Sequence, residues 1–165
     1  MKGWVVVAGL VLLAGCQQAP HEVSARVGVV AVVDGDTFDA QTQEGERVRV
    51  RVLGIDAPET AKKGVAGECG AEEARAALVA LVQGRDVDLV EDPRRDAVDR
   101  YGRRLGYVEV GGRDVGAELI RSGLVEAWWP RSAVTPGRGL AYQAAQAAAE
   151  AGRVGSWGRC GSIGR

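Results

Sequence analysis

The chain has 165 residues, of which 21 are lysine or arginine and 22 are aspartate or glutamate, so its formal net charge is −1. A nearly neutral molecule does not attract polyanions through its overall charge, and any nucleic-acid binding has to come from a local basic patch or a metal site. This length suffices for one domain with a substantial core but not for two.

The N-terminal residues have the pattern of an export signal. Lys2 is followed by a weakly polar run from Gly3 to Gly15, which is too short to span a bilayer. The end of this run, Leu13-Ala14-Gly15-Cys16, resembles the lipobox of bacterial lipoproteins, in which the cysteine is lipidated. Acyl chains on Cys16 would anchor the domain to a membrane of the cell envelope, outside the cytoplasm. Ordinary secretion without a lipid, or a buried first helix or strand, are the alternatives.

This pattern divides the chain into four expected parts. They are a signal peptide over residues 1–15, an anchor and linker over 16–25, a folded domain over 26–158 and a C-terminal tail over 159–165. With Cys16 lipidated, Cys69 and Cys160 remain as an even pair in an oxidising compartment, which favours a disulfide between them. Two free thiols are the alternative, because the sequence alone does not show that these residues are neighbours.

The first half of the domain has a β pattern. Valine-rich runs between residues 26 and 55 are broken by the turn signals Asp34-Gly35 and Glu44-Gly45, which predicts three strands. In the third strand, three valines alternate with three arginines over residues 47–52. The valines are therefore expected to face a core, and the arginines to lie on the opposite face.

Helical and strand patterns follow each other in the rest of the chain. The expected elements are a helix over 70–83, strands over 85–91 and 105–110, a helix capped by Asp114 and closed by Gly123, and a helix over 139–151. Five strands, with helices after the third and the fifth, indicate a β-rich α+β domain. A five-stranded Greek-key β-barrel of OB type with three helices fits this order, although the pattern alone also allows other α+β arrangements.

Carboxylates occur in two turns at strand ends. The segment Asp34-Gly35-Asp36-Thr37, taken alone, indicates only a hairpin turn. The segment 54–60 carries Asp56 and Glu59 in a proline-containing turn and, taken alone, indicates a solvated loop. Together the two segments bring several hard oxygen ligands to strand ends, which is what a calcium ion requires.

Arginines form two further clusters. Arg47 and Arg49 on the third strand are typical of a solvated face. The segment 99–104 interleaves arginines with Tyr101. Basic residues around an aromatic ring can bind phosphate and stack on a base, although one such loop by itself is weak evidence.

In this order and spacing, the four clusters resemble the staphylococcal-nuclease family. The similarity rests on Val33-Asp-Gly-Asp-Thr37, Arg51-Val-Leu-Gly-Ile-Asp-Ala-Pro-Glu-Thr60 and Tyr101-Gly-Arg103, and it extends over nearly all of residues 26–158. The resemblance implies an OB barrel with three helices, in agreement with the element order. It also implies a secreted, calcium-dependent nuclease that hydrolyses DNA or RNA to 3′-phosphate products.

The resemblance assigns catalytic roles to three residues. Arg51 and Arg103 match the pair that binds the scissile phosphate, and Glu59 matches the residue that activates the attacking water. Because a phosphodiester is negatively charged, calcium and two guanidinium groups can stabilise the further charge of the transition state. The planar fork of arginine suits this task better than lysine does, and a nearby carboxylate completes a general-base arrangement.

The resemblance also implies a metal site and a substrate site. Asp36 and Asp56 match the calcium-binding carboxylates, and Ala57 matches a ligand that uses its backbone carbonyl. The residues expected to contact substrate are Tyr101, Arg100 and Trp129. Trp128 or Trp129 falls where the family places an aromatic ring, with packing between helix and barrel as the alternative. Lys62 and Lys63 match a basic loop beside the site, and solvation of that loop is the simpler interpretation.

Two other functions compete with a nuclease. Some domains of this family have lost catalytic residues and bind nucleic acid or protein, but here Arg51, Glu59 and Arg103 are all present. A lipid-anchored barrel for another envelope ligand, with structural calcium, leaves the arginine pair unexplained. The expected partners are therefore a DNA or RNA substrate and a membrane reached through the lipid anchor. A monomer without a protein partner is expected.

Overall fold

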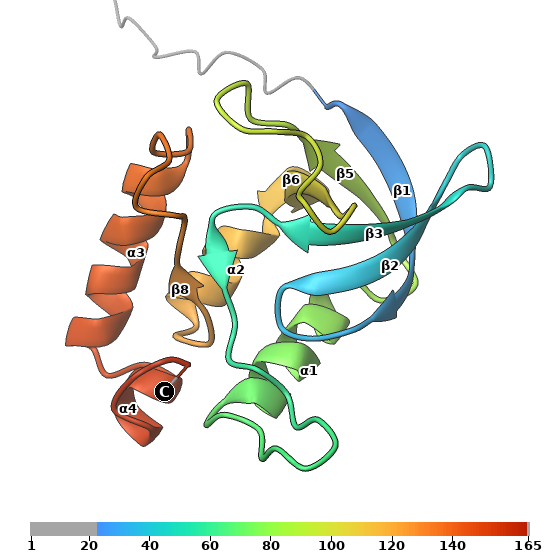
Figure 1. The fold of residues 1–165 in the computed structure, drawn as a ribbon. Coiled ribbons are helices and arrows are strands. Elements are labelled where there is room, and N and C mark those ends of the chain that lie inside the picture. The colour runs from blue at the N-terminus through green and yellow to red at the C-terminus, as the bar shows by residue number, and fades with distance from the viewer. Residues whose placement is uncertain (1–22, 165) are drawn as a thin grey trace, which may run out of the picture.

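The computed structural model describes residues 23–164 (Figure 1). The predicted signal peptide and the predicted lipidation site at Cys16 lie outside these residues. Within residues 23–164, no helix is long and apolar enough to cross a membrane.

Five strands close into a barrel. They are β1 (Ala25–Val32), β2 (Thr37–Thr42), β3 (Arg47–Val52), β5 (Asp86–Val90) and β6 (Arg104–Val110). β1 pairs with β2 and β5, β2 pairs with β3, and β5 pairs with β6, all antiparallel. A parallel pairing of β3 with β6 closes the ring. The predicted β-rich α+β class and the five-stranded OB-type barrel are confirmed.

The alternation in β3 places its side chains as predicted. Val50 and Val52 are fully buried, whereas Arg47 and Arg49 are exposed on the outer face of the barrel. Val50 faces Phe38 of β2 in the antiparallel register, and Phe38 is also fully buried. Because successive side chains of a strand point to opposite faces, the same pattern that builds the core also presents a row of arginines to solvent.

Three helices match the predicted segments. α1 (Ala71–Val82) follows Gly70, whose φ of 89° lies in the left-handed region that favours glycine, and α1 packs beneath the barrel in Figure 1. α2 (Val115–Arg121) is capped as predicted, with the Asp114 carboxylate accepting a hydrogen bond of 2.9 Å from the backbone N–H of Ala117. α3 (Gly139–Ala151) ends before Gly152 and packs against α2.

The structure adds four short elements. They are β4 (Ile55–Asp56), β7 (Arg113–Asp114), β8 (Glu126–Ala127) and a fourth helix, α4 (Ser156–Arg159). All three predicted helices are present, and α4 is additional to them. Two-residue strands and a four-residue helix are too short to show a period in the sequence, so tertiary contacts determine them. β4 pairs with β8 immediately beside the candidate site.

Candidate active site

Arg51, at the end of β3, connects the two carboxylate-bearing turns. Its side chain is only 12% exposed. Its Nε lies 2.9 Å from Oδ1 of Asp36, and its Nη2 lies 2.6 Å from Oδ1 of Asp56. Its Nη1 donates to the backbone carbonyls of Val52 and Ile55, at 2.9 and 2.7 Å. All three guanidinium nitrogens are therefore engaged, and the side chain is fixed in place.

The turn between β1 and β2 holds Asp36 against the next loop. A Cβ on Gly35 would lie 2.6 Å from the Cβ of Ala57 and 2.8 Å from that of Ala74, so only glycine allows this close packing. The backbone N–H of Asp36 donates to Asp34, and the Asp36 carboxylate accepts from the N–H of Ala57 at 2.9 Å. The predicted hairpin turn is present, and it also carries a buried carboxylate toward Asp56.

The two carboxylates lie in surroundings that disfavour their negative charge. Burial raises the pKa of Asp36 to about 7, although Arg51 opposes the shift. Burial also raises the pKa of Asp56, and the nearby charge of Glu59 adds to the effect. A cation bound beside such a pair would favour the ionised forms of both carboxylates. The site is therefore electrostatically suited to a positive ligand.

The donors at this position are oxygen atoms, which suit a hard cation. Asp36 and Asp56 supply two carboxylates bridged by one guanidinium. In residues 23–164, no three side chains of histidine, cysteine, aspartate or glutamate converge as a metal cluster. Calcium takes six to eight oxygen ligands and accepts backbone carbonyls and water among them, so two carboxylates fit such an ion as a partial ligand set. The assignment of the Ala57 carbonyl stays a prediction, because the contact recorded for Ala57 is made by its N–H.

Glu59 lies on the loop that joins β4 to α1, and its side chain is 63% exposed. Its carboxylate contacts Nζ of Lys62 at 2.6 Å. Its backbone is held from both sides by Glu68, whose carboxylate accepts the Glu59 N–H at 2.7 Å and whose own N–H donates to the Glu59 carbonyl at 2.9 Å. The structure thus places Glu59 near Asp56, but its carboxylate is paired with Lys62.

A cavity of about 470 Å³ lies beside Arg51, between β3, the loop before β6 and the segment after β8. Arg51 and Arg103 both line it, as do Tyr101, Arg100 and Trp129. Trp128 also lines the cavity and is 46% exposed. Trp129 packs closely on the start of α3, since a Cβ on Gly139 would lie 3.0 Å from its ring. Trp129 therefore both packs against the start of α3 and forms part of the cavity wall.

The loop before β6 presents its arginines around one aromatic ring. Tyr101 is 67% exposed, and the guanidinium carbons of Arg100 and Arg103 lie 4.8 and 5.4 Å from its ring centre. Asp99 accepts the backbone N–H groups of Tyr101 and Arg103, and its second oxygen lies 2.7 Å from Nε of Arg103. Asp99 therefore positions both the backbone and the guanidinium of Arg103.

Sequence reasoning missed two residues that hold others in place. Asp99 begins a turn and bonds the N–H groups two and four residues later, which is the Asx-type signal that could have identified it. Glu68 had no such signal, because its contact with Glu59 depends on how the loop folds back.

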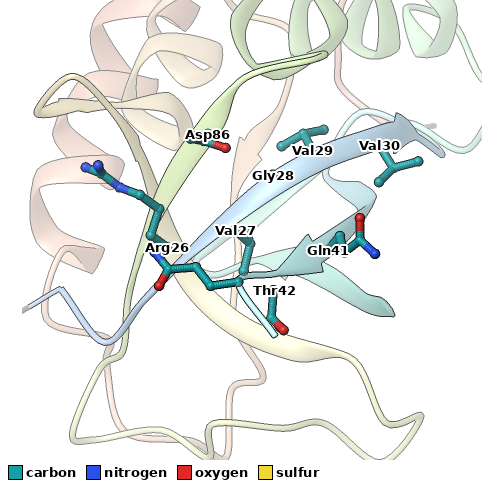
Figure 2. A pocket seen from close by; sticks show the side chains of 9 residues that line it. Arg26, Val27, Gly28, Val29, Val30, Gln41, Thr42 and Asp86 are labelled. Carbon is teal, nitrogen blue, oxygen red and sulfur yellow. The ribbon is translucent and has the colours of Figure 1, made fainter. Parts of the chain in front are cut away.

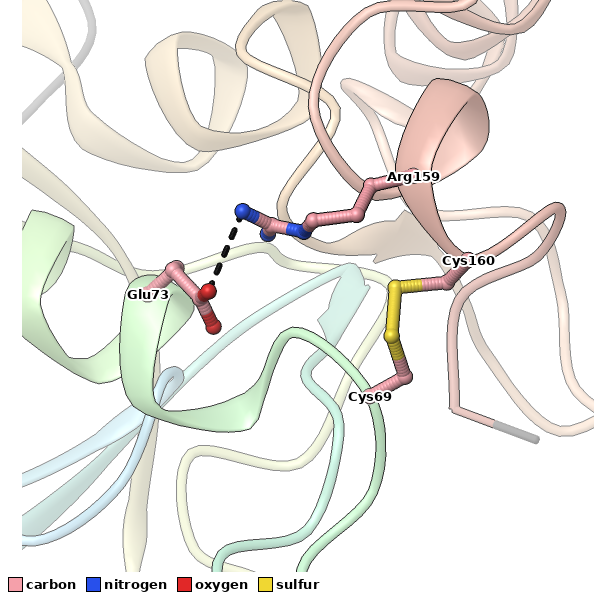
Figure 3. Close-up of a disulfide and its surroundings, with 4 residues drawn as sticks. All are labelled: Cys69, Glu73, Arg159 and Cys160. Carbon is pink, nitrogen blue, oxygen red and sulfur yellow. Dashed lines mark ion pairs between the residues drawn. A yellow bond between two sulfur atoms is a disulfide. The ribbon is translucent and has the colours of Figure 1, made fainter.

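The loop carrying Glu59 is tied to the C-terminal part of the chain. Cys69 and Cys160 form a disulfide, and the neighbouring Arg159 pairs with Glu73 of α1 at 3.1 Å (Figure 3). Cys69 directly follows Glu68, so the disulfide lies next to the residue that holds the Glu59 backbone. α4, absent from the sequence prediction, ends at Arg159, and the second cysteine follows it directly.

Comparisons with known proteins show what this arrangement is similar to. The family model described as "Staphylococcal nuclease homologue" matches residues 49–159, a segment that includes Arg51, Asp56, Glu59 and Arg103 but not Asp36.

Three relatives illustrate the similarity. A "Probable endonuclease LCL3" of Colletotrichum graminicola is 37% identical over 120 residues, which cover 69% of this chain and 42% of that protein. An "Endonuclease Htp3" of Saprolegnia parasitica is 32% identical over 155 residues, covering 83% and 72%. A "Thermonuclease" of Staphylococcus hyicus is 32% identical over 99 residues, covering 60% and 57%. The chain spans 42% of the length of the first relative and 57% of the third.

Proposed function

The chain belongs to the staphylococcal nuclease family, and on that premise we propose that it is a calcium-dependent enzyme that hydrolyses the phosphodiester bonds of DNA or RNA to 3′-phosphate products. Homology supports nuclease activity at the level of the family. The observation that carries the proposal for this chain is that Arg51 and Arg103 line one cavity, and that the carboxylates of Asp36 and Asp56, which do not themselves line it, both contact the Arg51 guanidinium.

In this proposal the two arginines bind the phosphate from two directions. Arg51 is fixed by its carboxylate and carbonyl acceptors, and Arg103 is fixed through Nε by Asp99. Guanidinium groups held in place before substrate arrives need little reorganisation when negative charge develops on the phosphate oxygens. Calcium, when bound by Asp36 and Asp56, would supply additional positive charge to the same oxygens.

Glu59 is the proposed acceptor of a proton from the attacking water. Both side chains of its ion pair with Lys62 are exposed to solvent. Because exposed ion pairs contribute little energy, water can displace the lysine. The water oxygen bonds to phosphorus while the bond from phosphorus to the 5′ oxygen breaks. The departing 5′ oxygen takes up a proton from solvent, Glu59 returns its proton to solvent, and the phosphate remains on the 3′ oxygen.

A cleavage assay tests this proposal. The purified protein is incubated with denatured DNA and with RNA, in calcium or in excess chelator, and the product ends are determined. We expect cutting in calcium, baseline signal in chelator and 3′-phosphate ends. Products with 3′-hydroxyl ends would contradict the proposed bond cleavage. A folded, calcium-binding protein that cuts neither substrate would instead favour a catalytically silent binding module.

We also propose that the protein works outside the cytoplasm, held to the cell envelope by a lipid on Cys16. The disulfide between Cys69 and Cys160 supports an oxidising compartment. In a Cys16→Ser variant the protein should move from the membrane fraction to the soluble fraction of lysed cells, with the Cys69–Cys160 bond intact. Retention of the variant in the membrane fraction would contradict the lipid anchor.

A further inference from the structure

A second groove adjoins the cavity of the candidate active site. It has a volume of about 470 Å³ and lies on the outer face of β2 and β3. Arg47, Arg49 and Asp39 line it on the barrel side, and Tyr101 and Arg103 line it on the loop side. Because Tyr101 and Arg103 also line the active-site cavity, the two hollows share a wall.

β3 places positive charge along the groove and into the active-site cavity. Arg47, Arg49 and Arg51 occupy every second position of the strand and point to the same face, so their backbones lie about 7 Å apart from one to the next. Arg51 is in the active-site cavity, and the other two are in the groove. This spacing is of the order of that between the phosphates of an extended polynucleotide strand.

The groove arginines are available to a ligand. The Arg47 side chain is exposed and forms no hydrogen bond or ion pair within residues 23–164, although its charge acts on Asp39. Arg49 donates two hydrogen bonds to Asp39, at 2.7 and 3.1 Å, but its side chain is 52% exposed. An exposed pair of this kind contributes at most about 1 kcal/mol, so a phosphate can replace Asp39. Although the whole chain has a net charge of −1, Arg47 and Arg49 form a local basic strip beside the proposed site of cleavage.

We propose that the groove binds phosphates of a single-stranded polynucleotide beyond the bond that is cut, and so favours substrates long enough to reach from the cavity to Arg47. The inference rests on the proposed function and extends it to substrate length and strandedness. Tyr101 separates the two hollows and is two-thirds exposed, which suits stacking on an unpaired base. In a duplex the bases are stacked on one another, and their faces do not reach the ring.

The test compares two double variants of the full chain that remove the same charge. Arg47→Ala with Arg49→Ala removes the groove arginines. Arg26→Ala with Arg121→Ala is the control: Arg26 pairs with Asp88 at 2.7 and 3.2 Å, much as Arg49 pairs with Asp39, and Arg121 is exposed on α2. Figure 2 shows Arg26 beside a different hollow of the barrel, formed around Gly28 and Gln41.

Binding is measured first, in chelator, so that no cutting is needed. With a labelled twelve-nucleotide oligothymidylate, we expect the groove variant to bind about tenfold more weakly, and its salt slope to become shallower by about 1.4, as for two lost phosphate contacts. The control should match the wild type. Equal losses of affinity in both variants would overturn the proposal, because the weaker binding would then follow from the reduced net charge and not from the position of the arginines. An equal loss for duplex DNA would overturn its single-stranded part.

Kinetics in calcium then separate this inference from the proposed function. KM for the twelve-nucleotide substrate should rise about tenfold in the groove variant, with a smaller rise for a dinucleotide that cannot reach the groove. An equal rise for both lengths would overturn the groove. A protein that binds through the groove but does not cut would leave the inference standing and contradict the proposed nuclease.

Discussion

Replacing Arg103 by alanine is expected to lower kcat about 10³-fold, by analogy with arginines that stabilise phosphoryl transition states. Arg103 is held by Asp99 through Nε, and no hydrogen bond of its Nη1 or Nη2 is recorded within residues 23–164. Both outer nitrogens can therefore form the parallel hydrogen bonds that a phosphate accepts. Arg103→Lys should recover only part of the activity, because lysine restores the charge but not the fork.

The measurement is steady-state cleavage of single-stranded DNA by wild type and variants, with unfolding curves as a check of the fold. Arg104→Ala is the matched control, since Arg104 is the next residue, pairs with Glu91 at 3.3 Å and does not line the cavity. We expect the control to keep wild-type kcat. Equal activities for Arg103→Ala and the wild type would remove Arg103 from the catalytic residues.

Replacing Arg138 by methionine is expected to lower the free energy of unfolding by about 3–5 kcal/mol. The Arg138 side chain is only 12% exposed and pairs with both Asp114 and Glu109. Its guanidinium carbon lies 4.4 Å from the ring centre of Tyr107. Methionine fills similar space but leaves two partly buried carboxylates without their cation, and this cost is much larger than that of losing an exposed pair.

Arg138 also belongs to a wider network that attaches α3 to the barrel. Tyr142 of α3 donates to the Asp114 carboxylate at 2.8 Å, and Tyr107 of β6 donates to Asp92 at 2.6 Å. Asp92 also accepts a backbone N–H from Gly137, the residue before Arg138. The loss of one member should therefore loosen the packing of α3 on the barrel.

Urea unfolding checks this prediction. Arg113→Met is the control, because Arg113 pairs with Glu118 at 3.6 Å on the surface, and it should cost at most about 1 kcal/mol. Adding Asp114→Asn and Glu109→Gln to Arg138→Met should recover part of the lost stability, since the unpaired charges are then gone. Equal midpoints for Arg138→Met and Arg113→Met would mean that the buried pairs contribute no more than the surface pair.

The strands and long helices were predictable because their residues repeat with a clear period. The alternation of valine and arginine in β3 indicates both the strand and the face that enters the core, and Val50 and Val52 are buried accordingly. The N-cap at Asp114 was also predictable, because it depends on a contact with a residue only three positions later. β4, β8 and α4 were not predictable, since each covers only about one period of its pattern and no repeat can be seen, and β4 and β8 depend on pairing with each other across the chain.

The candidate site was predictable in composition but not in geometry. Asp36, Arg51 and Asp56 each belong to a segment that, taken alone, indicates a turn, a solvated face or a loop, and only the closed barrel brings them into contact. The pairing of Glu59 with Lys62 and the support from Glu68 depend on the path of an irregular loop. Such contacts leave no periodic signal in the sequence.

The disulfide has a consequence for proteolysis. It joins residue 69 to residue 160 and so encloses Arg103, α2 and α3 within a covalent ring, while Arg51 and Glu59 lie outside that ring. The segment 131–134 between β8 and α3 is largely exposed and offers a protease an accessible stretch of backbone. A single cut there opens the ring but leaves both pieces on one covalent molecule. Arg51 and Arg103 stay together on the N-terminal piece, and the disulfide keeps the piece that carries α3 attached to it until a reductant releases it.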